Sequence, residues 1–234
     1  MYIILLNMKK KIILLFYLLV CFNAFSKDLL ADQESYIDAI EIIKRSENSF
    51  EIMSKNKELK NLPKFFNESK AVLIFPEVYE GGLLFGAKGG NGMLMIRKQG
   101  VWSGPFFFTI GGVSLGIQIG VKKGRVIFTV MTEKGLKSIL KERVKFGVDV
   151  DAAIASQGIG LSAESTVRLA DVFSFTDNKG LFIGTSLEGT YLQPRNDLNK
   201  AIHGKSISPT DILSKVYDHK ETTRLVQKLA RQLP

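Results

Sequence analysis

The chain has 234 residues, of which 45% are hydrophobic and 24% are charged. A chain of this length and composition can bury a sizeable core, which excludes an intrinsically disordered protein. Its 32 Lys and Arg residues outnumber its 23 Asp and Glu residues, and the resulting formal net charge of +9 favours an anionic partner.

Residues 1–26 have the pattern of a signal peptide. Lysines lead into an apolar run, residues 12–22, that is too short for a comfortable membrane span, and small residues follow it. We expect cleavage near Ser26 and export to the periplasm or cell envelope; an uncleaved membrane anchor is the alternative. The only cysteine, Cys21, lies in this segment, and its lipidation is a weaker alternative. Cleavage would leave 29 basic and 23 acidic residues, a net charge of +6, and no cysteine.

The mature chain, residues 27–234, contains no evident linker and predicts a single domain. It begins with an amphipathic segment, residues 32–56, whose apolar positions recur at helical spacing. Ile40, Ile43 and Phe50 lie on or near that apolar stripe. We therefore expect an N-terminal helix.

Strands are expected to dominate the middle of the chain. Residues 71–75 form a buried-strand run that should end at Pro76, and glycine-separated apolar stretches continue to Gly124. The later elements expected are a strand at 125–132, a helix at 133–140, a strand at 144–150, a hairpin of strands 167–175 and 181–192, and a final helix from 208 to 232. This order predicts an α+β fold with a large curved antiparallel β-sheet, barrel- or sandwich-like, flanked by N- and C-terminal helices.

Residues 112–116 match the G-x-S-x-G turn that presents a hydrolase nucleophile, here Ser114. The alternation continues to Val121 instead of entering a helix, and only His203 and His219 could complete a triad. A structural serine within a strand is therefore the favoured interpretation. The alternation also leaves one face almost bare of side chains, which predicts a trough for a helix or an acyl chain. The sequence does not choose between these two occupants, and the N-terminal helix of the chain is the conservative candidate.

The glycine-rich residues 86–92 match neither phosphate-binding fingerprint, because a strand and not a helix follows them. We expect a hairpin turn at this position. Asp149 and Asp151 alternate with apolar residues, which indicates a solvated edge more than a site. No cluster has metal-ligand spacing, so the sequence predicts no catalytic residue, no metal and no cofactor.

Basic residues form the most informative polar pattern. Lys122, Lys123 and Arg125 cluster near a turn, and Arg224 and Lys228 share one face of the expected final helix. Cations near an anionic bilayer contribute about 1 kcal/mol each to binding. A solvated outer face is the alternative for the helix. Because export is expected, a membrane surface is favoured over a nucleic acid as the anionic partner.

Three segments of the chain resemble the SYLF domain family in order and spacing. They read AVLIFPEVYEGGLLFGAKGGNGML (71–94), WSGPFFFTIGGVSLGIQIG (102–120) and KGLFIGTSLEGTYLQPRNDLNKAIHGKSISPTDIL (179–213), and the resemblance extends over residues 35–215. It implies binding of phosphoinositide or other anionic phospholipid without enzymatic activity. The resemblance further implies that eukaryotic members join SH3 or FYVE domains and contact actin, whereas bacterial members are typically exported, stand-alone lipid-binding proteins. With neither domain present, actin is not expected as a partner.

The sequence and the resemblance together predict a single SYLF-type domain that binds an anionic phospholipid membrane. The residues expected to bind headgroups are Lys122, Lys123, Arg125, Arg224 and Lys228. The residues expected to insert into the membrane are Ile40, Ile43 and Phe50. The alternatives are a structural envelope protein that contacts peptidoglycan or protein through the flat glycine-rich sheet, and an esterase acting through Ser114.

Overall fold

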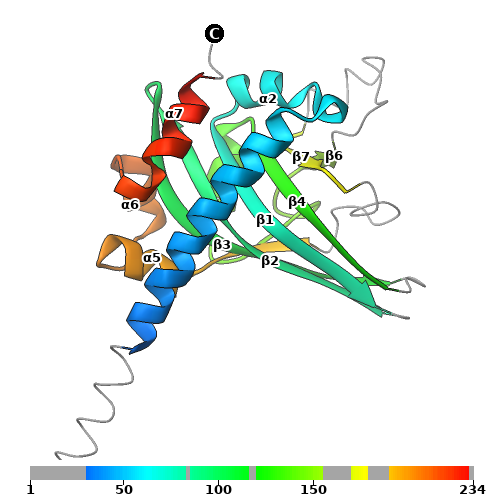
Figure 1. Ribbon diagram of the computed structural model, residues 1–234, viewed down its shortest axis with the longest axis horizontal. Helices are drawn as coiled ribbons and strands as arrows, with labels where there is room; N and C mark the ends of the chain where they lie inside the picture. Colours follow the sequence, from blue (N-terminus) through cyan, green and yellow to red (C-terminus); the bar gives the residue numbers. More distant parts are fainter. Residues whose placement is uncertain (1–29, 83–84, 116–119, 155–169, 179–189, 232–234) are drawn as a thin grey trace, which may run out of the picture.

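The computed structural model describes residues 30–82, 85–115, 120–154, 170–178 and 190–231. In these ranges the chain forms an α+β fold, as predicted. One long helix, residues 30–54, crosses the outer face of a curled β-sheet, and the C-terminal helices pack beside it (Figure 1). No helix within these ranges has the length and apolar character that a membrane crossing requires.

Eight of the described segments form one sheet in the order β5-β8-β3-β2-β1-β4-β7-β6. The strands are β1 (Ala71–Gly82), β2 (Phe85–Lys98), β3 (Val101–Leu115), β4 (Gly120–Val130), β5 (Val144–Lys145), β6 (Ala152–Ile154), β7 (Val172–Thr176) and β8 (Thr190–Pro194). All neighbours are antiparallel except β6 and β7, which are parallel. The four long strands β1–β4 form the centre of the sheet.

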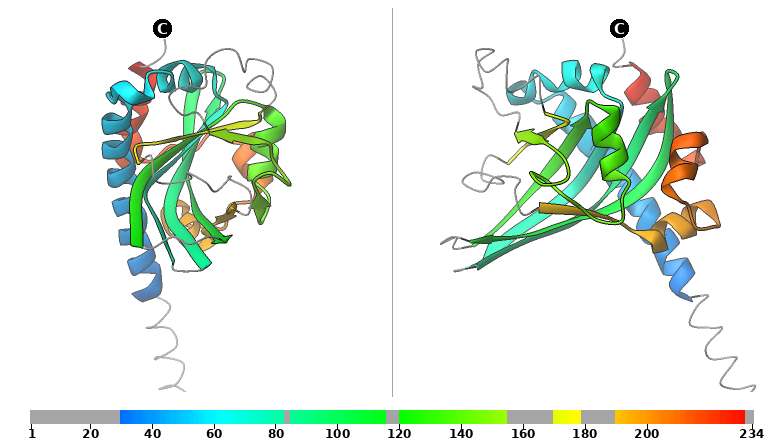
Figure 2. Two further views of the ribbon diagram at one scale, coloured as in Figure 1. Left: turned by 90° about the vertical axis from the view of Figure 1, so that its right-hand side faces the viewer. Right: turned by 180° about the vertical axis from the view of Figure 1, so that it is seen from behind.

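Short helices connect and cover the strands. After the N-terminal helix these are η1 (Lys57–Leu59), α2 (Leu62–Glu68), α3 (Glu133–Ile139), α5 (Asn196–His203), α6 (Pro209–Ser214), η3 (Lys220–Thr222) and α7 (Thr223–Arg231). The N-terminal helix, α2 and α7 lie on the outer face of the sheet, and α3 lies on the opposite, inner side (Figure 2).

Both faces of the central strands are buried, and alternate residues of each strand supply two separate cores. The inner core is rich in phenylalanine, including Phe75, Phe106 and Phe128. The outer core is formed where the N-terminal helix covers sheet residues such as Ile74 and Phe107. The N-terminal helix therefore fixes which part of the outer face remains open to solvent.

The local backbone explains the positions of two prolines, and the first of them differs from the sequence prediction. Pro76 does not end the first strand: β1 continues to Gly82, and its register shifts around Phe75 and Val78. At such a bulge a strand residue can lack a ladder hydrogen bond, so proline is tolerated. Pro63 lies in the first turn of α2, where the missing N–H has no partner in any case.

Three other predictions about local structure were wrong. Among the described residues, β7 and β8 do not pair with each other as the predicted hairpin would require, because β7 pairs with β4 and β8 pairs with β3; residues 167–169 and 179–189 of that prediction lie outside the described residues. Residues 86–92 lie within β2 instead of forming a turn. The final helix is divided into α6, η3 and α7, although its predicted start is confirmed by a capping box between Ser208 and Asp211.

Candidate functional site

One end of β1–β4 extends beyond the N-terminal helix and leaves its outer face uncovered (Figure 1). A single row crosses all four strands there: Val113 pairs with Ala87, Ala87 with Gly81, and Gly81 with Val121. We call these four residues the strand tip. Val113 is 76% exposed and Val121 is 77% exposed, and Ala87 is also exposed. The outer face of the tip is therefore an apolar surface in contact with water.

The next row toward the helix is amphipathic. Tyr79 is the register partner of Lys123, and the Lys123 Nζ lies 5.2 Å from the centroid of the Tyr79 ring. The two residues follow the tip on the same outer face, because successive rows on one face are two residues apart. Lys123 is one of the cations that the sequence predicted.

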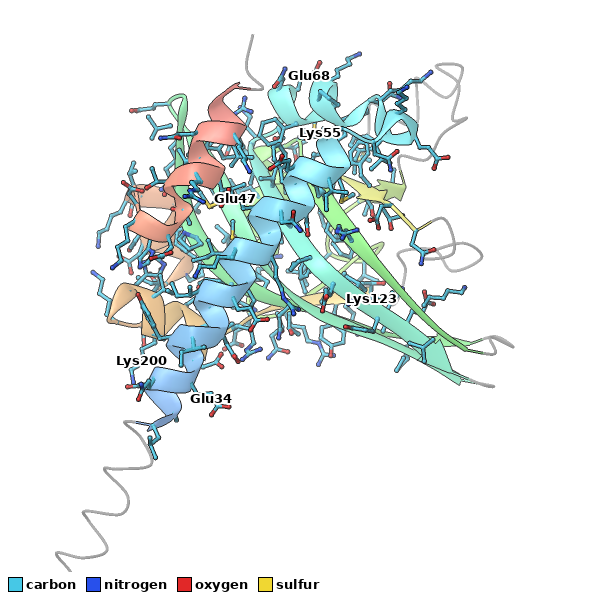
Figure 3. The ribbon with its side chains drawn as sticks, in the orientation of Figure 1. Glu34, Glu47, Lys55, Glu68, Lys123 and Lys200 are labelled. Atoms are coloured by element: carbon cyan, nitrogen blue, oxygen red, sulfur yellow. The ribbon has the colours of Figure 1, made fainter. Side chains whose placement is uncertain are left out.

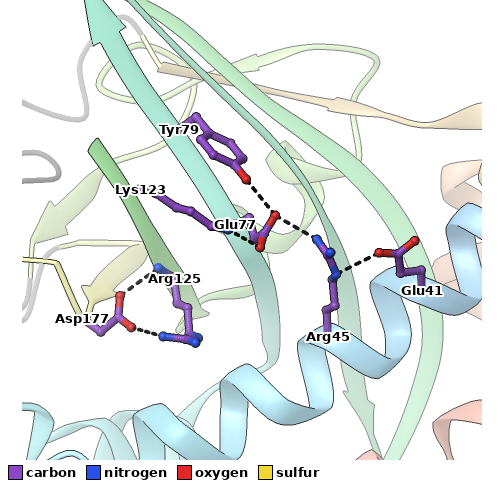
Figure 4. Close-up of polar contacts among 7 residues, drawn as sticks. All are labelled: Glu41, Arg45, Glu77, Tyr79, Lys123, Arg125 and Asp177. Carbon is purple, nitrogen blue, oxygen red and sulfur yellow. Dashed lines mark hydrogen bonds and ion pairs between the residues drawn. The ribbon is translucent and has the colours of Figure 1, made fainter. Parts of the chain in front are cut away.

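Glu77 lies in the bulge of β1 and is the centre of a polar network (Figure 4). Its carboxylate lies 2.8 Å from the Arg45 guanidinium of the N-terminal helix and 2.5 Å from the Lys123 Nζ, and it accepts a 3.0 Å hydrogen bond from the Tyr79 hydroxyl. Arg45 also pairs with Glu41 at 2.9 Å. Lys123 is the main cause that lowers the pKa of Glu77, and Glu77 in turn raises the pKa of Lys123.

Arg125 belongs to a second ion pair on the same strand, β4. Its Nη1 lies 2.7 Å from Asp177 Oδ2, and its backbone N–H donates to Asp177 Oδ1 at 2.8 Å. These two contacts fasten the end of β7 to β4. Between this pair and Glu77 lies an open depression of about 490 Å³, with Pro76 and Lys123 on its wall. The structure thus brings Lys123 and Arg125 together, as predicted.

Opposite the exposed tip, the inner face carries buried charge. Glu80 of β1 is the register partner of Lys88 on one side and of Lys122 on the other. Glu80 is 1% exposed and Lys88 is 6% exposed, and Lys122 is half-buried. Lys122 therefore points to the face opposite Lys123 and Arg125, so the predicted group of three cations is divided between two faces.

The remaining predicted cations, Arg224 and Lys228, lie on α7. Lys228 Nζ lies 3.0 Å from Glu47 and 2.6 Å from Glu51 of the N-terminal helix, while Arg224 is exposed. Figure 3 shows Glu47 and Lys123 well apart, with the N-terminal helix running between α7 and the position of Lys123. The predicted headgroup residues therefore do not form one site.

The residues predicted to insert into a membrane lie under the N-terminal helix instead. Ile43 is fully buried and Phe50 is 3% exposed, both in the outer core, and Ile40 is half-buried against that core. Burying these side chains against the sheet removes the apolar surface that insertion would use. In this conformation Ile43 and Phe50 are core residues, and insertion through them, which would require the helix to leave the sheet, stays a prediction.

The trough prediction is also corrected by the packing. The N-terminal helix covers the face that bears Phe107, whereas Gly112 and Gly120 lie in rows of the opposite, inner face. The helix packs where the outer face carries large buried apolar side chains such as Phe107 and Ile127, and a glycine row offers no such surface to bury. Residues 116–119 of the predicted trough lie outside the described residues.

Comparison with known proteins identifies the family. The profile described as "Ysc84: Las17-binding protein actin regulator" matches residues 111–232, just over half of the chain. The chain belongs to the Ysc84/SYLF family. Among its relatives, Protein YSC84 of Saccharomyces cerevisiae is 29% identical over 143 residues, covering 58% of this chain and 30% of that protein. The human SH3 domain-containing YSC84-like protein 1 is 29% identical over 166 residues, covering 70% of this chain and 48% of that protein.

Membership in the Ysc84/SYLF family confirms the resemblance predicted from the sequence. The matched region spans between about a third and a half of these relatives, so the activities of the whole relatives do not transfer directly. The description of the family names a binding and regulatory role and not a catalytic one. The signal-peptide residues 1–26 lie outside the described residues.

The residues that an esterase would need are placed differently in this Ysc84/SYLF member. Ser114 lies within β3, which continues to Leu115, and its register partner is Gly86 of β2; residues 116–119, where a nucleophile elbow would enter its helix, lie outside the described residues. His203 Nε2 lies 2.8 Å from the Pro105 carbonyl oxygen, and His219 Nδ1 accepts from the Glu221 N–H. Among the described residues, no three His, Cys, Asp or Glu side chains gather in a way that could hold a metal ion.

Glu77 and Tyr79 are the site residues that the sequence did not reveal. Their spacing places both on one strand face, but the expected end of the strand at Pro76 hid that signal. The partners Arg45 and Lys123 are far away in sequence, and only the fold brings them to Glu77.

Proposed function

We propose that this chain is a non-enzymatic module that binds membrane surfaces containing anionic phospholipid. The observation that carries the proposal is the position of Lys123 and Arg125, which follow the exposed apolar tip on one face of β4. A membrane surface presents the matching order, because its acyl chains lie beneath a layer of phosphate groups. The excess of basic over acidic residues in the whole chain supports the same partner.

For a headgroup to bind at this site, its phosphate must join or replace the carboxylates that already pair with the cations. Arg45, Lys123 and Arg125 are paired with Glu41, Glu77 and Asp177, so the local charge is balanced. The side chains of Lys123 and Arg125 are 52% and 36% exposed, which leaves donors open to the depression. A phosphate with several acceptor oxygens can join or replace a carboxylate there through charge-assisted hydrogen bonds.

The location of this activity is proposed from the sequence. The signal-peptide pattern of residues 1–26 supports export, which would place the module in the periplasm or on the inside of a bacterial cell envelope. The N-terminal sequence of the protein recovered from cells tests this point. A chain that begins at or close to Lys27 supports export, and a chain that retains residues 1–26 opposes cleavage.

Co-sedimentation with vesicles tests the proposed function. Phosphatidylcholine vesicles with phosphatidylglycerol should bind the protein, pure phosphatidylcholine vesicles should not, and added salt should weaken the binding. The double variant Lys123→Ala/Arg125→Gln should bind less than the unaltered protein. Lys55→Ala/Lys200→Ala is the matched control, because it removes two other exposed, ion-paired cations. Binding that ignores lipid charge and salt would refute the headgroup part of the proposal.

The variant Glu77→Gln is a second test of the proposed function, in which binding to anionic vesicles should increase instead of decrease. It removes the carboxylate that holds Lys123 and Arg45 and leaves a side chain of similar shape. We expect tighter binding to anionic vesicles, because both cations become available to phosphate. Thermal unfolding of each variant distinguishes changes in binding from loss of the fold. Unchanged or weaker binding of a folded Glu77→Gln protein would show that these cations do not contact the headgroups.

A protein partner is the second candidate function, and the names of the relatives favour it. The family is described as Las17-binding and actin-regulating, and one yeast relative is named LAS seventeen-binding protein 3. The same exposed face could contact an actin-related or envelope protein. Co-sedimentation with actin filaments in the absence of lipid tests the first of these, and cross-linking in the native cell followed by identification of the captured protein tests the second.

A further inference from the structure

At the strand tip, the usual arrangement of a sheet is reversed: apolar residues face the solvent and charged residues are buried. In a sheet that meets water on one side, apolar residues normally face the core and charged residues face the solvent. At the tip, the exposed outer row is Val113, Ala87, Gly81 and Val121, and the adjacent inner row contains the buried Glu80 and Lys88. Since strand side chains alternate between faces, the register that buries Glu80 and Lys88 places Gly81 and Ala87 on the outer face.

The outer row is a continuous surface and not a set of scattered hydrophobic residues. Its four members are joined by backbone pairing across four strands, and a Cβ added at Gly81 would lie 3.3 Å from Val121 Cγ2. The absence of a side chain at Gly81 keeps this row low and flat. Exposed apolar surface of this kind marks a contact with a partner or a membrane.

We infer that the strand tip inserts into the boundary between headgroups and acyl chains of an anionic bilayer. Val113 and Val121 would enter the acyl region, and Tyr79 and Lys123 would lie at the level of the headgroups. Rows on one face of a strand are about 7 Å apart. That separation fits the depth of about 5–10 Å to which interfacial elements bury their apolar face. This inference rests on the proposed function and names the element that enters the membrane.

Charge favours a bilayer over a second copy of the chain as the occupant of the tip. Two copies of a chain with a formal net charge of +9 repel each other, whereas the phosphate groups of an anionic bilayer attract it. The amphipathic Tyr79 suits the same boundary, because tyrosine places its ring in apolar surroundings and its hydroxyl in the polar layer. Insertion through the tip also leaves the N-terminal helix docked, with Ile43 and Phe50 in the core.

The first test compares matched valine substitutions in the full chain. Val113→Ser/Val121→Ser alters the tip, and Val101→Ser/Val148→Ser alters two valines that are 55% and 79% exposed elsewhere. All four positions are solvent-exposed, so both variants should fold. Binding to phosphatidylcholine–phosphatidylglycerol vesicles should weaken roughly tenfold for the tip variant and stay unchanged for the control. Equal binding by both variants would overturn the inference.

The second test reports the position of the tip in the bound protein. In a Cys21→Ser background, Val121→Cys or Val148→Cys carries a fluorophore that shifts to the blue in apolar surroundings. With anionic vesicles, the label at residue 121 should shift and be quenched by brominated acyl chains, whereas the label at residue 148 should not change.

Bound protein whose label at 121 stays in water overturns tip insertion and leaves the proposed function intact. No vesicle binding by any variant overturns both. A shift without vesicles that grows with protein concentration assigns the tip to a second copy and overturns the inference.

Discussion

Glu80 and Lys88 are direct neighbours across β1 and β2, and both side chains are almost completely buried on the inner face of the sheet. Burial lowers the pKa of Lys88, and the negative charge of Glu80 partly offsets this effect. Neither Glu80 oxygen has a hydrogen-bond partner among the described residues, so its interactions with lysine are mainly electrostatic. A buried charge that loses its counter-charge is strongly destabilising.

We predict that Glu80→Leu destabilises the protein by roughly 3–5 kcal/mol, because it leaves the cation of Lys88 buried without this carboxylate. The double variant Glu80→Leu/Lys88→Leu should recover part of that loss, since it removes Lys88 together with the carboxylate, while the half-buried Lys122 keeps its charge beside position 80. Urea unfolding of the two single variants and the double variant measures the coupling. A loss below about 1 kcal/mol for Glu80→Leu would mean that the buried charges are not coupled.

The bulge of β1 makes two adjacent glycines differ in what they tolerate. A Cβ at Gly90 would lie less than 3.0 Å from the Glu77 carbonyl oxygen, whereas a Cβ at Gly89 would lie 3.7 Å from its nearest neighbour. Gly90→Ala should therefore destabilise the protein by about 1–3 kcal/mol or more, and Gly89→Ala should have little effect. Thermal unfolding compares the two. Similar stability of both variants would show that the bulge can move without strain.

Local sequence signals predicted the elements that depend on local chemistry. The apolar stripe of the first helix, the capping pair Ser208 and Asp211, and the short helix after Thr132 all appear as expected. These features follow from side-chain period and from hydrogen bonds within one turn, so no distant partner is needed to establish them.

The parts that the sequence did not reveal depend on distant pairings. Strand alternation divides Val121 from Lys122, but it does not say which face a helix will cover. The partners of β7 and β8 are set by the open edges of β4 and β3, not by the short connection expected between the two strands. For the same reason the sequence located Lys123 and Arg125 but not their carboxylate partners Glu77 and Asp177.

His203 should make stability depend on pH in the range where histidine titrates. Burial lowers the pKa of His203 below its usual value of 6.5, although a hydrogen bond to the Pro105 carbonyl opposes this shift. The unfolded chain then binds more protons than the folded protein between the two pKa values, so stability falls as the pH drops below 6.5. The ring centroids of Phe106 and Tyr217 lie 5.6 Å and 5.0 Å from that of the imidazole and contribute to this burial.

We expect His203→Gln to remove much of the change in stability between about pH 7.5 and pH 5.5, because glutamine does not titrate and can still donate to the carbonyl. Urea unfolding at several pH values measures this slope. His219→Gln, the control at the other histidine, should keep most of it. An equal slope in the His203→Gln and unaltered proteins would contradict the role assigned to His203.

The contact between α7 and the N-terminal helix combines ion pairs with buried leucines. Lys228 lies within 3.0 Å of Glu47 and Glu51, and Leu225 and Leu229 are fully buried in the outer core. Partly exposed ion pairs contribute at most about 1 kcal/mol, whereas truncating a buried leucine to alanine costs about 2–5 kcal/mol. Apolar burial should therefore hold α7 in place, and the charges should only adjust its position.

The consequence is that α7 should stay docked when its ion pairs are lost. We predict a loss below about 1 kcal/mol for Lys228→Ala and a loss several times larger for Leu229→Ala, measured by urea unfolding. Lys228, followed by Lys55, lowers the pKa of Glu51 to about 2, so this carboxylate stabilises the fold above pH 4.5 and loses that effect as the pH falls toward 2. Lys228→Ala should therefore flatten the acid dependence as well. If it instead destabilised the protein as much as Leu229→Ala, charge would hold α7 in place, and an anionic membrane could compete for Lys228 and release the helix.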